Sequence, residues 1–538
     1  MDGGDSRAGA ESRDPAGGKA PAVGSGRDRG ASTGLWKDLV WLLPAVALWF
    51  AVRGHALTLG FVGDDFQWWQ HARMALQDPA LLFDGYGGFR PLNTWTLALD
   101  QLIWGTNPFG YHLTNLLLHL ACGLLLWCFL SREGFSAPAR LSVVTLWLCS
   151  PFTEETAVFV AARFEPVMAL LWLGLAVLWP RPGEAWTGRR TAAAVVVAGL
   201  TIVTKESWVV LPGFVIAFDL LLARTKLRTA LVHGSLAAAA VAVYLAVYLM
   251  HPAILPGEFF HAGAAGALKV PHAWAAFLGL RGLRPLAFSF GLPEACGVVV
   301  MLLLGWLAWR RRWYLVGVGF AFFLLPFLPI LPVGWMTSRY TTIPLLGFLI
   351  VVAASARGAI EEAPERWRLA GRVAAGSMAF LLLLANLAWL RGDRTDAQRL
   401  WEAHRKLLGE VETFLPELPL DRPLVVVRAE REAPLLALSL ASQGVPKLYY
   451  PRNSGPYAMA DWGALFSYLL ERRGGPMLVD ASGSVGPGEY AVIAHVAGRF
   501  VRVPPQSDSA DGEAAAWRAR GFPVGVLRIV RLRTHAMP

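Results

Sequence analysis

The chain has 538 residues, of which 55% are hydrophobic and only 16% are charged. Soluble proteins carry about 25% charged residues, so this composition excludes an ordinary soluble protein and favours one that crosses a membrane several times. The formal net charge of +10 does not indicate nucleic-acid binding, because the basic residues lie in short clusters between apolar segments, as topology signals do.

Residues 1–33 are rich in Gly, Ala, Ser, Arg and Asp. This composition cannot bury a hydrophobic core, so we expect a disordered segment on the cytoplasmic side. The segment is also too long and too charged before the first apolar residues to resemble a cleaved secretory signal.

Residues 34–390 contain about eleven apolar segments that are predicted to cross the membrane as helices. The loops on the side of the N-terminus are all basic, as at Arg310, Arg311 and Arg312, which predicts that this side is cytoplasmic. An odd number of spans then places the C-terminus outside. The predicted spans are Leu35–Val52, 112–130, 139–152, 156–179, 191–204, 207–223, 229–250, 292–309, 313–333, 341–356 and 372–390.

Residues 54–111 form the first external loop, which is far too long for a simple connection. Its segment "FQWWQHARMALQDPALLF" mixes aromatic, apolar and polar residues and predicts helices that lie in the membrane interface. Asp64 and Asp65 stand side by side at the external end of the first span. Carboxylates in such a place often cap a helix or face water, so their position alone does not assign them a role.

Residues 391–538 leave the membrane and are predicted to form a small α/β domain outside it. The segments "RPLVVVRA", "PMLVDA", "YAVIAHV" and "VGVLRIVRL" are typical of strands, and "APLLALSLASQG" followed by "KLYYPR" reads as a helix and a further strand. The predicted fold class is therefore an all-α polytopic membrane protein with a small C-terminal α/β domain.

Further polar residues lie at the external ends of other predicted spans. They are Arg90 in the first loop, Glu154, Glu155, Arg163 and Glu165 between the third and fourth spans, Lys205 and Glu206 between the fifth and sixth, and Arg339 with Tyr340 at a later helix end. A charge near the bilayer centre costs about 2.5–3.5 kcal/mol, so such residues usually face a cavity or a partner. One alternative is internal neutralisation, for example of Lys205 by Glu206. By the predicted topology, however, all of these groups converge on one face of the membrane and line an outward-facing cavity.

The combination of carboxylates and cations favours one class of chemistry. Arginine binds phosphate with two parallel hydrogen bonds, and lysine binds it as a point charge. This suits the transfer of a sugar from a polyprenyl phosphate to an acceptor hydroxyl. One carboxylate accepts the hydroxyl proton, and the cations stabilise the departing phosphate. A single displacement of this kind inverts the anomeric configuration.

Five segments of the chain, taken in this order, resemble the motifs of a known family. They are "GDDF", "FRPLNTWTLALDQLIWGTNPFGYHLTNLLLHL", "TEETAVFVAARFEPVMALL", "TKESWVVLP" and "SRYTTIPLLGF". With them the chain resembles the GT-C superfamily of integral-membrane glycosyltransferases. The closest likeness is to bacterial relatives of the protein O-mannosyltransferases that carry transmembrane spans and tetratricopeptide repeats. The resemblance extends over residues 35–350, and the second segment is the most specific match.

This resemblance implies that an acidic residue of the first loop is the general base. On that basis Asp64 is the predicted base, and Asp65 orients the base or the acceptor. The candidate ligands of the lipid phosphate are Arg163, Lys205, Arg339 and Arg90. The candidate contacts to donor or acceptor are Glu154, Glu155, Glu165, Glu206 and Tyr340.

The chain departs from that family pattern at several positions. The residue at the place of the family's hairpin histidine is Thr153, which leaves only Glu154 and Glu155 as hard metal ligands there. We therefore expect no metal and no other cofactor, with a divalent cation left open. Ala162 replaces a family glycine, and Ser338 replaces a family glutamate. These changes leave the sugar and the acceptor open.

The resulting hypothesis is an inverting, polyprenyl-phosphate-dependent glycosyltransferase of the bacterial inner membrane. Its active site faces the periplasm or the cell exterior, and its acceptor is a protein, a lipid or a glycan. The alternatives are a polymerase or ligase of lipid-linked glycans, a membrane transporter or flippase, and a non-catalytic scaffold. Transporters often contain internal repeats, and the sequence shows no such two-fold self-similarity.

Overall fold

The computed structural model describes most of the chain, and six of its helices are long and apolar enough to cross a membrane. These are Pro108–Arg132, Val160–Leu178, Leu227–Tyr248, Leu292–Arg311, Arg339–Glu362 and Glu365–Arg391, with Ala137–Leu148 and Tyr314–Ile330 as shorter apolar helices. The chain is therefore a multi-pass membrane protein. The described residues are 40–62, 64–83, 89–250, 267–278, 291–311, 313–332, 338–418, 424–428, 464–473, 477–480, 491–496, 499–503, 506–519 and 524–530.

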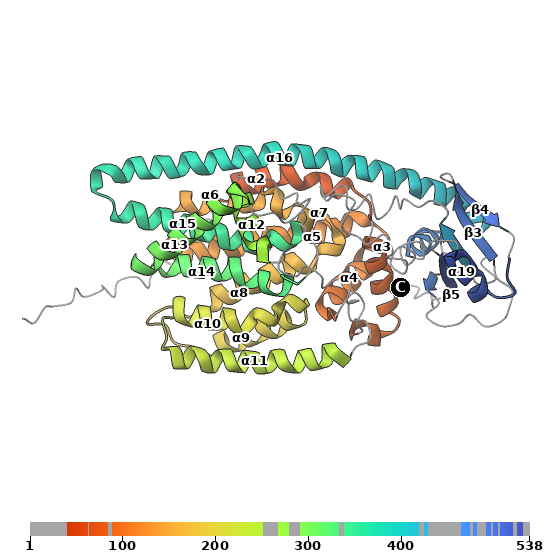
Figure 1. The fold of residues 1–538 in the computed structure, drawn as a ribbon, viewed down its shortest axis with the longest axis horizontal. Helices are drawn as coiled ribbons and strands as arrows, with labels where there is room; N and C mark the ends of the chain where they lie inside the picture. Colours follow the sequence, from red (N-terminus) through yellow and green to blue (C-terminus); the bar gives the residue numbers. More distant parts are fainter. Residues whose placement is uncertain are drawn as a thin grey trace, which may run out of the picture. The chain divides into compact units, whose positions relative to one another are not determined.

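The membrane part is a bundle of helices that pack against their neighbours in pairs (Figure 1). The strongest pairings are α14 with α15, α10 with α11, and α5 with α8. The helices of this part are α2 (Leu43–Arg53), α5 (Pro108–Arg132), α6 (Ala137–Leu148), α8 (Phe164–Leu178), α9 (Gly188–Ile202), α10 (Leu211–Leu221), α11 (Leu227–Met250), α12 (Lys269–Phe277), α13 (Leu292–Arg311), α14 (Tyr314–Leu324), α15 (Thr342–Glu362) and α16 (Glu365–Phe414).

Two glycines allow α14 and α15 to approach closely. A side chain on Gly347 would lie 2.3 Å from the backbone nitrogen of Phe323, and one on Gly319 would lie 2.7 Å from that of Val351. Membrane helices use small residues in this way, because packing between backbones replaces the hydrophobic effect as the source of association. The two glycines therefore let the backbones of α14 and α15 pack in direct contact.

Residues 54–111, predicted as the first external loop, contain two helices, α3 (Asp65–Ala75) and α4 (Pro91–Trp104), with a 3₁₀ turn, η2 (Pro79–Phe83), between them. Helices α3 and α4 pack against each other. The helices predicted in this loop are therefore present, and their place in the membrane interface stays a prediction.

The connection between α6 and α8 differs from the prediction of a helix that starts at residue 156. It consists of η3 (Pro151–Thr153), α7 (Glu154–Val158) and η4 (Val160–Ala162). The helix breaks at Phe159, whose backbone is extended with φ −88° and ψ 119°. The carbonyl of Phe159 accepts a hydrogen bond of 2.9 Å from Nδ2 of Asn115 on α5, so a side chain replaces an intrahelical donor.

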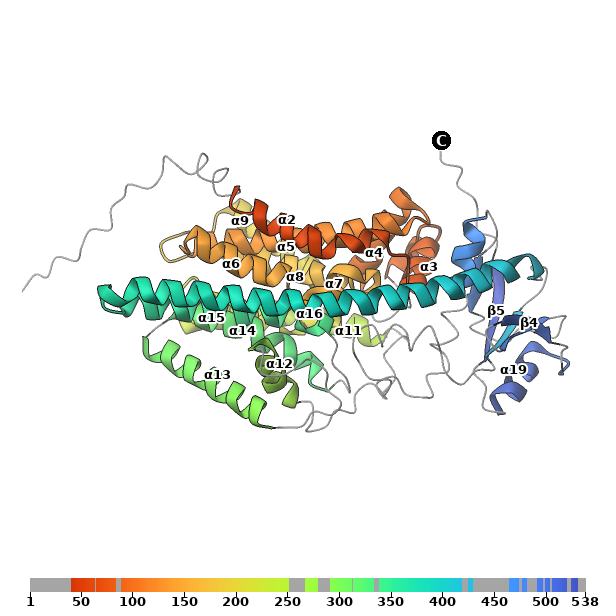
Figure 2. The ribbon, with the colours of Figure 1, turned by 90° about the horizontal axis from the view of Figure 1, so that it is seen from above.

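Two other predicted spans have corrected bounds. The span predicted at 313–333 is α14 followed by the 3₁₀ helix η8 (Leu325–Ile330), since Pro326 and Pro329 lack the N–H that an α-helix needs. The span predicted at 372–390 belongs to the 50-residue helix α16, which continues across the predicted boundary at 390 and 391. α16 runs beside α15 and α6 (Figures 1 and 2).

The described residues near the C-terminus form a five-stranded sheet in the order β2-β5-β1-β3-β4. β1 pairs with β3 in parallel and with β5 in antiparallel orientation, and helix α19 (Ala510–Ala519) contacts β1 and β5 (Figure 1). The strands are β1 (Leu424–Arg428), β2 (Met477–Asp480), β3 (Ala491–Val496), β4 (Arg499–Val503) and β5 (Val524–Val530).

Four of these strands, β1, β2, β3 and β5, coincide with segments predicted as strands, whereas β4 was not predicted. The predicted helix at 433–444 and the predicted strand at 447–452 lie outside the described residues. A further helix at 464–471 packs in one buried cluster with residues of the first loop and of α16. The division of 391–538 into a separate domain stays a prediction.

Candidate active site

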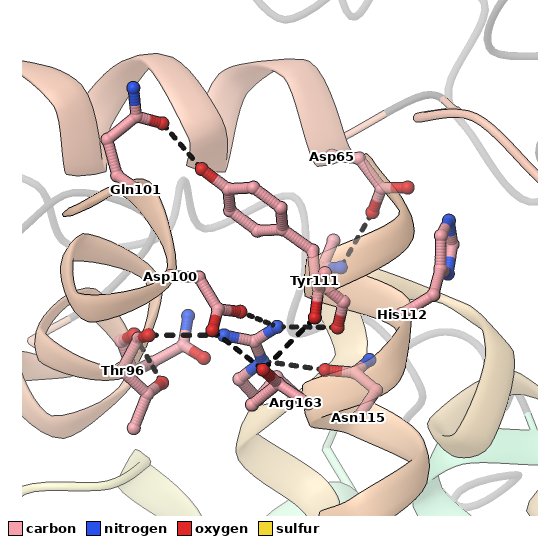
Figure 3. Close-up of polar contacts among 12 residues, drawn as sticks. Asp65, Thr96, Asp100, Gln101, Tyr111, His112, Asn115 and Arg163 are labelled. Carbon is pink, nitrogen blue, oxygen red and sulfur yellow. Dashed lines mark hydrogen bonds and ion pairs between the residues drawn. The ribbon is translucent and has the colours of Figure 1, made fainter. Parts of the chain in front are cut away.

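Asp65 is fully buried in the first turn of α3 and is bound on both carboxylate oxygens. Its Oδ2 accepts a hydrogen bond of 3.0 Å from the backbone N–H of Val62, and its Oδ1 accepts one of 2.7 Å from that of Ala161 (Figure 3). Burial raises the pKa of Asp65 from 3.8 to about 8, although both N–H groups act against this. Because both carboxylate oxygens are bound to backbone N–H groups, Asp65 holds the start of α3 against η4.

Asp64 precedes α3 and is only half buried. Its side chain does not cap the helix, so its oxygens accept no capping hydrogen bond from the backbone of α3. Burial raises the pKa of Asp64 above 3.8, the positive charge of Arg339 lowers it, and the negative charge of Glu155 raises it. Asp64 therefore lies within electrostatic range of both Arg339 and Glu155.

Three cations and two aromatic rings alternate in a series that ends at Arg339. Arg90 Cζ lies 4.6 Å and Lys205 Nζ 4.7 Å from the ring centre of Phe164. Lys205 Nζ also lies 4.6 Å, and Arg339 Cζ 5.5 Å, from the ring centre of Tyr340. We call these five residues the cation–ring row. A cation over an aromatic face is stabilised by the quadrupole of the ring, so the row holds its three charges in fixed places.

The first two cations of the row are also paired with carboxylates. Arg90 binds Glu206 through two hydrogen bonds of 2.9 and 2.6 Å, and Lys205 forms a buried ion pair with Glu165. Internal neutralisation, the predicted alternative, is therefore found for Lys205, but its partner is Glu165 and not the neighbouring Glu206. Lys205 is extended, with φ −165° and ψ 152°, and successive side chains of an extended segment point in opposite directions.

The side chain and the backbone N–H of the third cation, Arg339, both contact the carboxylate of Glu155. Its Nε lies 3.4 Å from Oε1 of Glu155, and its backbone N–H donates a hydrogen bond of 3.0 Å to Oε2. Glu155 in α7 therefore holds the short helix η9 (Ser338–Thr341) in place. The Arg339 side chain keeps 15% of its surface exposed, whereas Lys205 keeps 5%.

Arg163, a predicted phosphate ligand, is instead part of a closed internal network (Figure 3). Its Nη2 lies 2.5 Å from Oδ2 of Asp100, and its Nε donates a hydrogen bond of 2.6 Å to Oδ1 of Asn115. Its Nη1 donates to the backbone oxygen of Thr96 at 3.2 Å, and its Nη2 also donates to that of Tyr111 at 2.9 Å. Four of the five N–H donors are thus used inside the protein, and the side chain is fully buried. The structure therefore places Arg163 in an internal network rather than among the exposed candidate ligands.

Glu154, a predicted contact to donor or acceptor, is paired with Arg53 at the end of α2. Arg53 is fully buried and also donates to the carbonyl of Ser150, at 2.5 Å, and to Oγ1 of Thr153, at 3.3 Å. Thr153 therefore accepts a hydrogen bond at the position where the family pattern has histidine. We assign this group to holding α2 against the α6–α8 connection.

Sequence reasoning missed three residues of these networks, namely Arg53, Asp100 and Phe164. For Asp100 a signal was present, since it is the one acidic residue in α4, among apolar neighbours. An isolated carboxylate in an apolar helix usually has a buried partner. Phe164 gave no signal, because a phenylalanine beside an apolar helix is ordinarily part of the core.

Among the residues that the structure describes, no group of three or more His, Cys, Asp or Glu side chains is arranged to hold a metal ion. The assembled site therefore consists of Asp64, Glu155 and the cation–ring row with its carboxylates.

The comparisons with known proteins return membrane-protein relatives of limited extent. No protein-family model matches the chain. A segment of 124 residues, 19% of this chain, is 32% identical to Protein O-mannosyl-transferase Tmtc3 from Drosophila melanogaster. The chain spans only 13% of the length of that curated relative. The local likeness confirms the resemblance to protein O-mannosyltransferases over this segment.

Two solved structures cover 94% of this chain and all of their own chains. Both are crystal structures of ArnT from Cupriavidus metallidurans, one bound to undecaprenyl phosphate and one in the apo state. Their TM-scores are 0.46 and 0.44, and their sequence identities are 14% and 15%.

Proposed function

We propose that the protein is a glycosyltransferase of the GT-C kind. It moves a sugar from a polyprenyl-phosphate donor to an acceptor hydroxyl at the outer face of the membrane. The observation that supports this most is the half-buried Asp64, within range of Arg339 at the end of the cation–ring row. The segment similar to an O-mannosyl-transferase also supports a transferase.

In this proposal Asp64 is the general base. The acceptor oxygen attacks the anomeric carbon while its proton moves to Asp64. The bond between the anomeric carbon and the phosphate oxygen breaks, and the lipid phosphate leaves as an anion. A single displacement inverts the configuration at that carbon. Asp65 acts as a positioning residue, because its two backbone hydrogen bonds fix the turn that presents Asp64.

The cation–ring row would hold the departing phosphate. Arg339 is the cation of the row whose charge acts on the proposed base, and it is partly exposed, so it is the first candidate ligand. Arg90 keeps 12% of its side chain exposed and is the second. Lys205 is more deeply buried between two rings and stabilises the row from within. Fixed cations of this kind stabilise a developing anion without having to reorganise during the reaction.

We also propose a topology of eleven spans in a bacterial inner membrane, with the N-terminus in the cytoplasm. On α13, the exposed Trp306 and Trp309 stand beside Arg310 and Arg311. Tryptophan gathers at membrane interfaces, and arginine gathers on the cytoplasmic side, so this end of α13 fits the cytoplasmic boundary. The C-terminal sheet and the proposed active site would then lie on the periplasmic side.

The direct test is transfer in vitro by the purified protein, with a panel of radiolabelled polyprenyl-phosphate sugars and candidate acceptors. We expect transfer with at least one donor, and a fall in turnover of about 10²–10⁴-fold in Asp64→Asn, the range for removal of a general base. Asp78→Asn is the matched control, because Asp78 is an exposed acid of the same loop. Full turnover of Asp64→Asn, or failure with every donor, would contradict the proposal. Movement of an intact donor across vesicles would instead favour a flippase.

A further inference from the structure

Helix 464–471 lies against the helix that follows the proposed base. Its Tyr468 is 4% exposed, and the ring centre lies 5.3 Å from each of the rings of Phe61, Phe66 and Trp69. The Tyr468 hydroxyl donates a hydrogen bond of 3.1 Å to the backbone oxygen of Thr106. Edge-on ring contacts of this kind are directional, so they fix the orientation of α3 as well as its distance.

Two polar contacts continue the same interface along α3. Nε2 of Gln70 donates a hydrogen bond of 3.1 Å to Oγ of Ser467, and Nε of Arg73 lies 2.7 Å from Oε1 of Glu471. The contacting residues of α3 are spaced by three or four positions, so they occupy one face of the helix. Asp65 fixes α3 to η4 independently of this face.

Helix 464–471 is itself attached to the end of α16. Nη1 of Arg472 lies 3.3 Å from Oε1 of Glu412, and Nη2 of Arg473 donates to the backbone oxygen of Glu412 at 3.4 Å. Val411 and Phe414 of α16 belong to the same buried cluster as α3. The C-terminal part of the chain thus reaches the first loop through a continuous set of contacts.

We propose that Tyr468 and Glu471 are positioning residues, and that helix 464–471 holds α3 and thereby the Asp64–Asp65 turn in its working orientation. α3 has 11 residues, and isolated helices shorter than about 12–15 residues are marginal in water, so α3 depends on its packing. The link to catalysis rests on the proposed function, whereas the dependence of α3 on helix 464–471 does not.

The first experiment removes the ring. In Tyr468→Ala we expect the turnover number for sugar transfer to fall by about 10²-fold, the loss that a displacement of roughly 1 Å can cause. The KM for the donor should stay the same, because the cation–ring row lies elsewhere. Tyr468→Phe keeps the ring contacts and should retain most of the turnover. In parallel, hydrogen exchange of residues 61–76 should become faster in Tyr468→Ala and stay slow in Tyr468→Phe.

The second experiment exchanges the charges of the Arg73–Glu471 pair. Arg73→Glu and Glu471→Arg should each speed up exchange in residues 61–76 and lower turnover, and the double variant should restore both. This rescue distinguishes positioning from general loss of folding, so it keeps the proposal testable if Tyr468→Ala does not fold.

The two proposals fail in different ways. Unchanged exchange of residues 61–76 in every single variant would overturn the positioning role, whatever the activity. Faster exchange with an unchanged turnover number per folded molecule would overturn it as well. If the wild type transfers no sugar from any donor, the proposed function fails, while faster exchange in Tyr468→Ala and its rescue in the charge-swapped pair still support the dependence of α3 on helix 464–471.

Discussion

The network around Arg163 and the cation–ring row contain the same residue types in different surroundings. In the network the side chains of Arg163 and Asp100 are 0% and 4% exposed, and Arg163 also donates to two backbone oxygens. In the row the Arg90 and Arg339 side chains are 12% and 15% exposed, and Glu206, the partner of Arg90, is 28% exposed. Both regions are ion-paired, but of the two only the row keeps part of its charged surface exposed.

This difference shows that pairing with a carboxylate does not by itself exclude a binding role. What matters is whether a cation can change partners without leaving a buried charge behind. If Arg163 turned toward a ligand, Asp100 would remain as an unpaired carboxylate in a dry environment, which is strongly unfavourable. If Arg90 turned toward a ligand, Glu206 would still have access to water.

The largest expected effect breaks the closed network. Arg163→Ala should destabilise the fold by about 3–5 kcal/mol, the typical result of removing one partner of a buried ion pair. Thermal unfolding in detergent measures this effect. The double variant Arg163→Met with Asp100→Leu should be more stable than the single variant, because no unpaired charge remains. A stable but inactive Arg163→Ala would return Arg163 to the candidate ligands.

The next effect concerns the open row under the proposed function. Arg339→Gln should keep the unfolding temperature close to that of the wild type and lower kcat/KM for the donor by roughly 10–100-fold. That range corresponds to the loss of one or two hydrogen bonds to a charged group. Arg339→Lys keeps the charge but not the two parallel N–H donors of the guanidinium, so its kcat/KM should lie between those of the wild type and Arg339→Gln. If Arg339→Gln lost as much stability as Arg163→Ala, the row would have a structural role and the proposed ligand role of Arg339 would be contradicted.

A smaller effect is a shift in pH dependence. Asp64 must be ionised to accept a proton, so activity is present above its pKa and is lost as the pH falls through it. Burial raises this pKa above 3.8, Arg339 lowers it and Glu155 raises it. Glu155→Gln should therefore move the acidic limb of kcat/KM to lower pH, and Arg339→Gln should move it to higher pH. Shifts in the same direction for both variants would contradict Asp64 as the base.

The smallest effect is expected at an exposed ion pair at the other end of the helices. Nε of Arg357 lies 2.7 Å from Oε1 of Glu361, and the two side chains are 35% and 61% exposed. Glu361→Gln should change the unfolding free energy by no more than about 1 kcal/mol, since exposed pairs contribute little. An effect in thermal unfolding comparable to that of Arg163→Ala would remove the distinction between open and closed pairs.

Topology predicted only part of the set of polar residues that meet. Arg90 of the first loop, with Lys205 and Arg339 at predicted span ends, come together around Phe164 and Tyr340. Arg163 and Glu154, predicted to join them, lie in separate networks with Asp100 and Arg53. Span ends are readable from hydropathy, because each polar residue interrupts or borders an apolar segment.

The choice of partners could not be predicted in the same way. Lys205 pairs with Glu165 on another element rather than with the adjacent Glu206, and this depends on local backbone directions that hydropathy does not report. Arg163 looked like a ligand because its partner, Asp100, lies in a different helix.

Contacts between segments far apart in the chain could not be predicted from the sequence either. Gln70 and Ser467 touch although they are 397 positions apart, and nothing in either segment indicates the other. The predicted end of the last span at 390 agrees with the apolar segment Glu365–Arg391, but hydropathy did not predict that the helix α16 itself continues to Phe414.

The neutrality of the cation–ring row has a consequence for selectivity. Each of its positive charges already has a negative neighbour, so the row presents little net attraction to stray inorganic anions or to soluble sugar phosphates. Under the proposed function, the affinity for the donor must then come mainly from its hydrocarbon tail in the bilayer. The donor phosphate only replaces a carboxylate as the partner of a cation in the row. Such an enzyme would ignore abundant water-soluble competitors and respond to the density of its lipid in the membrane.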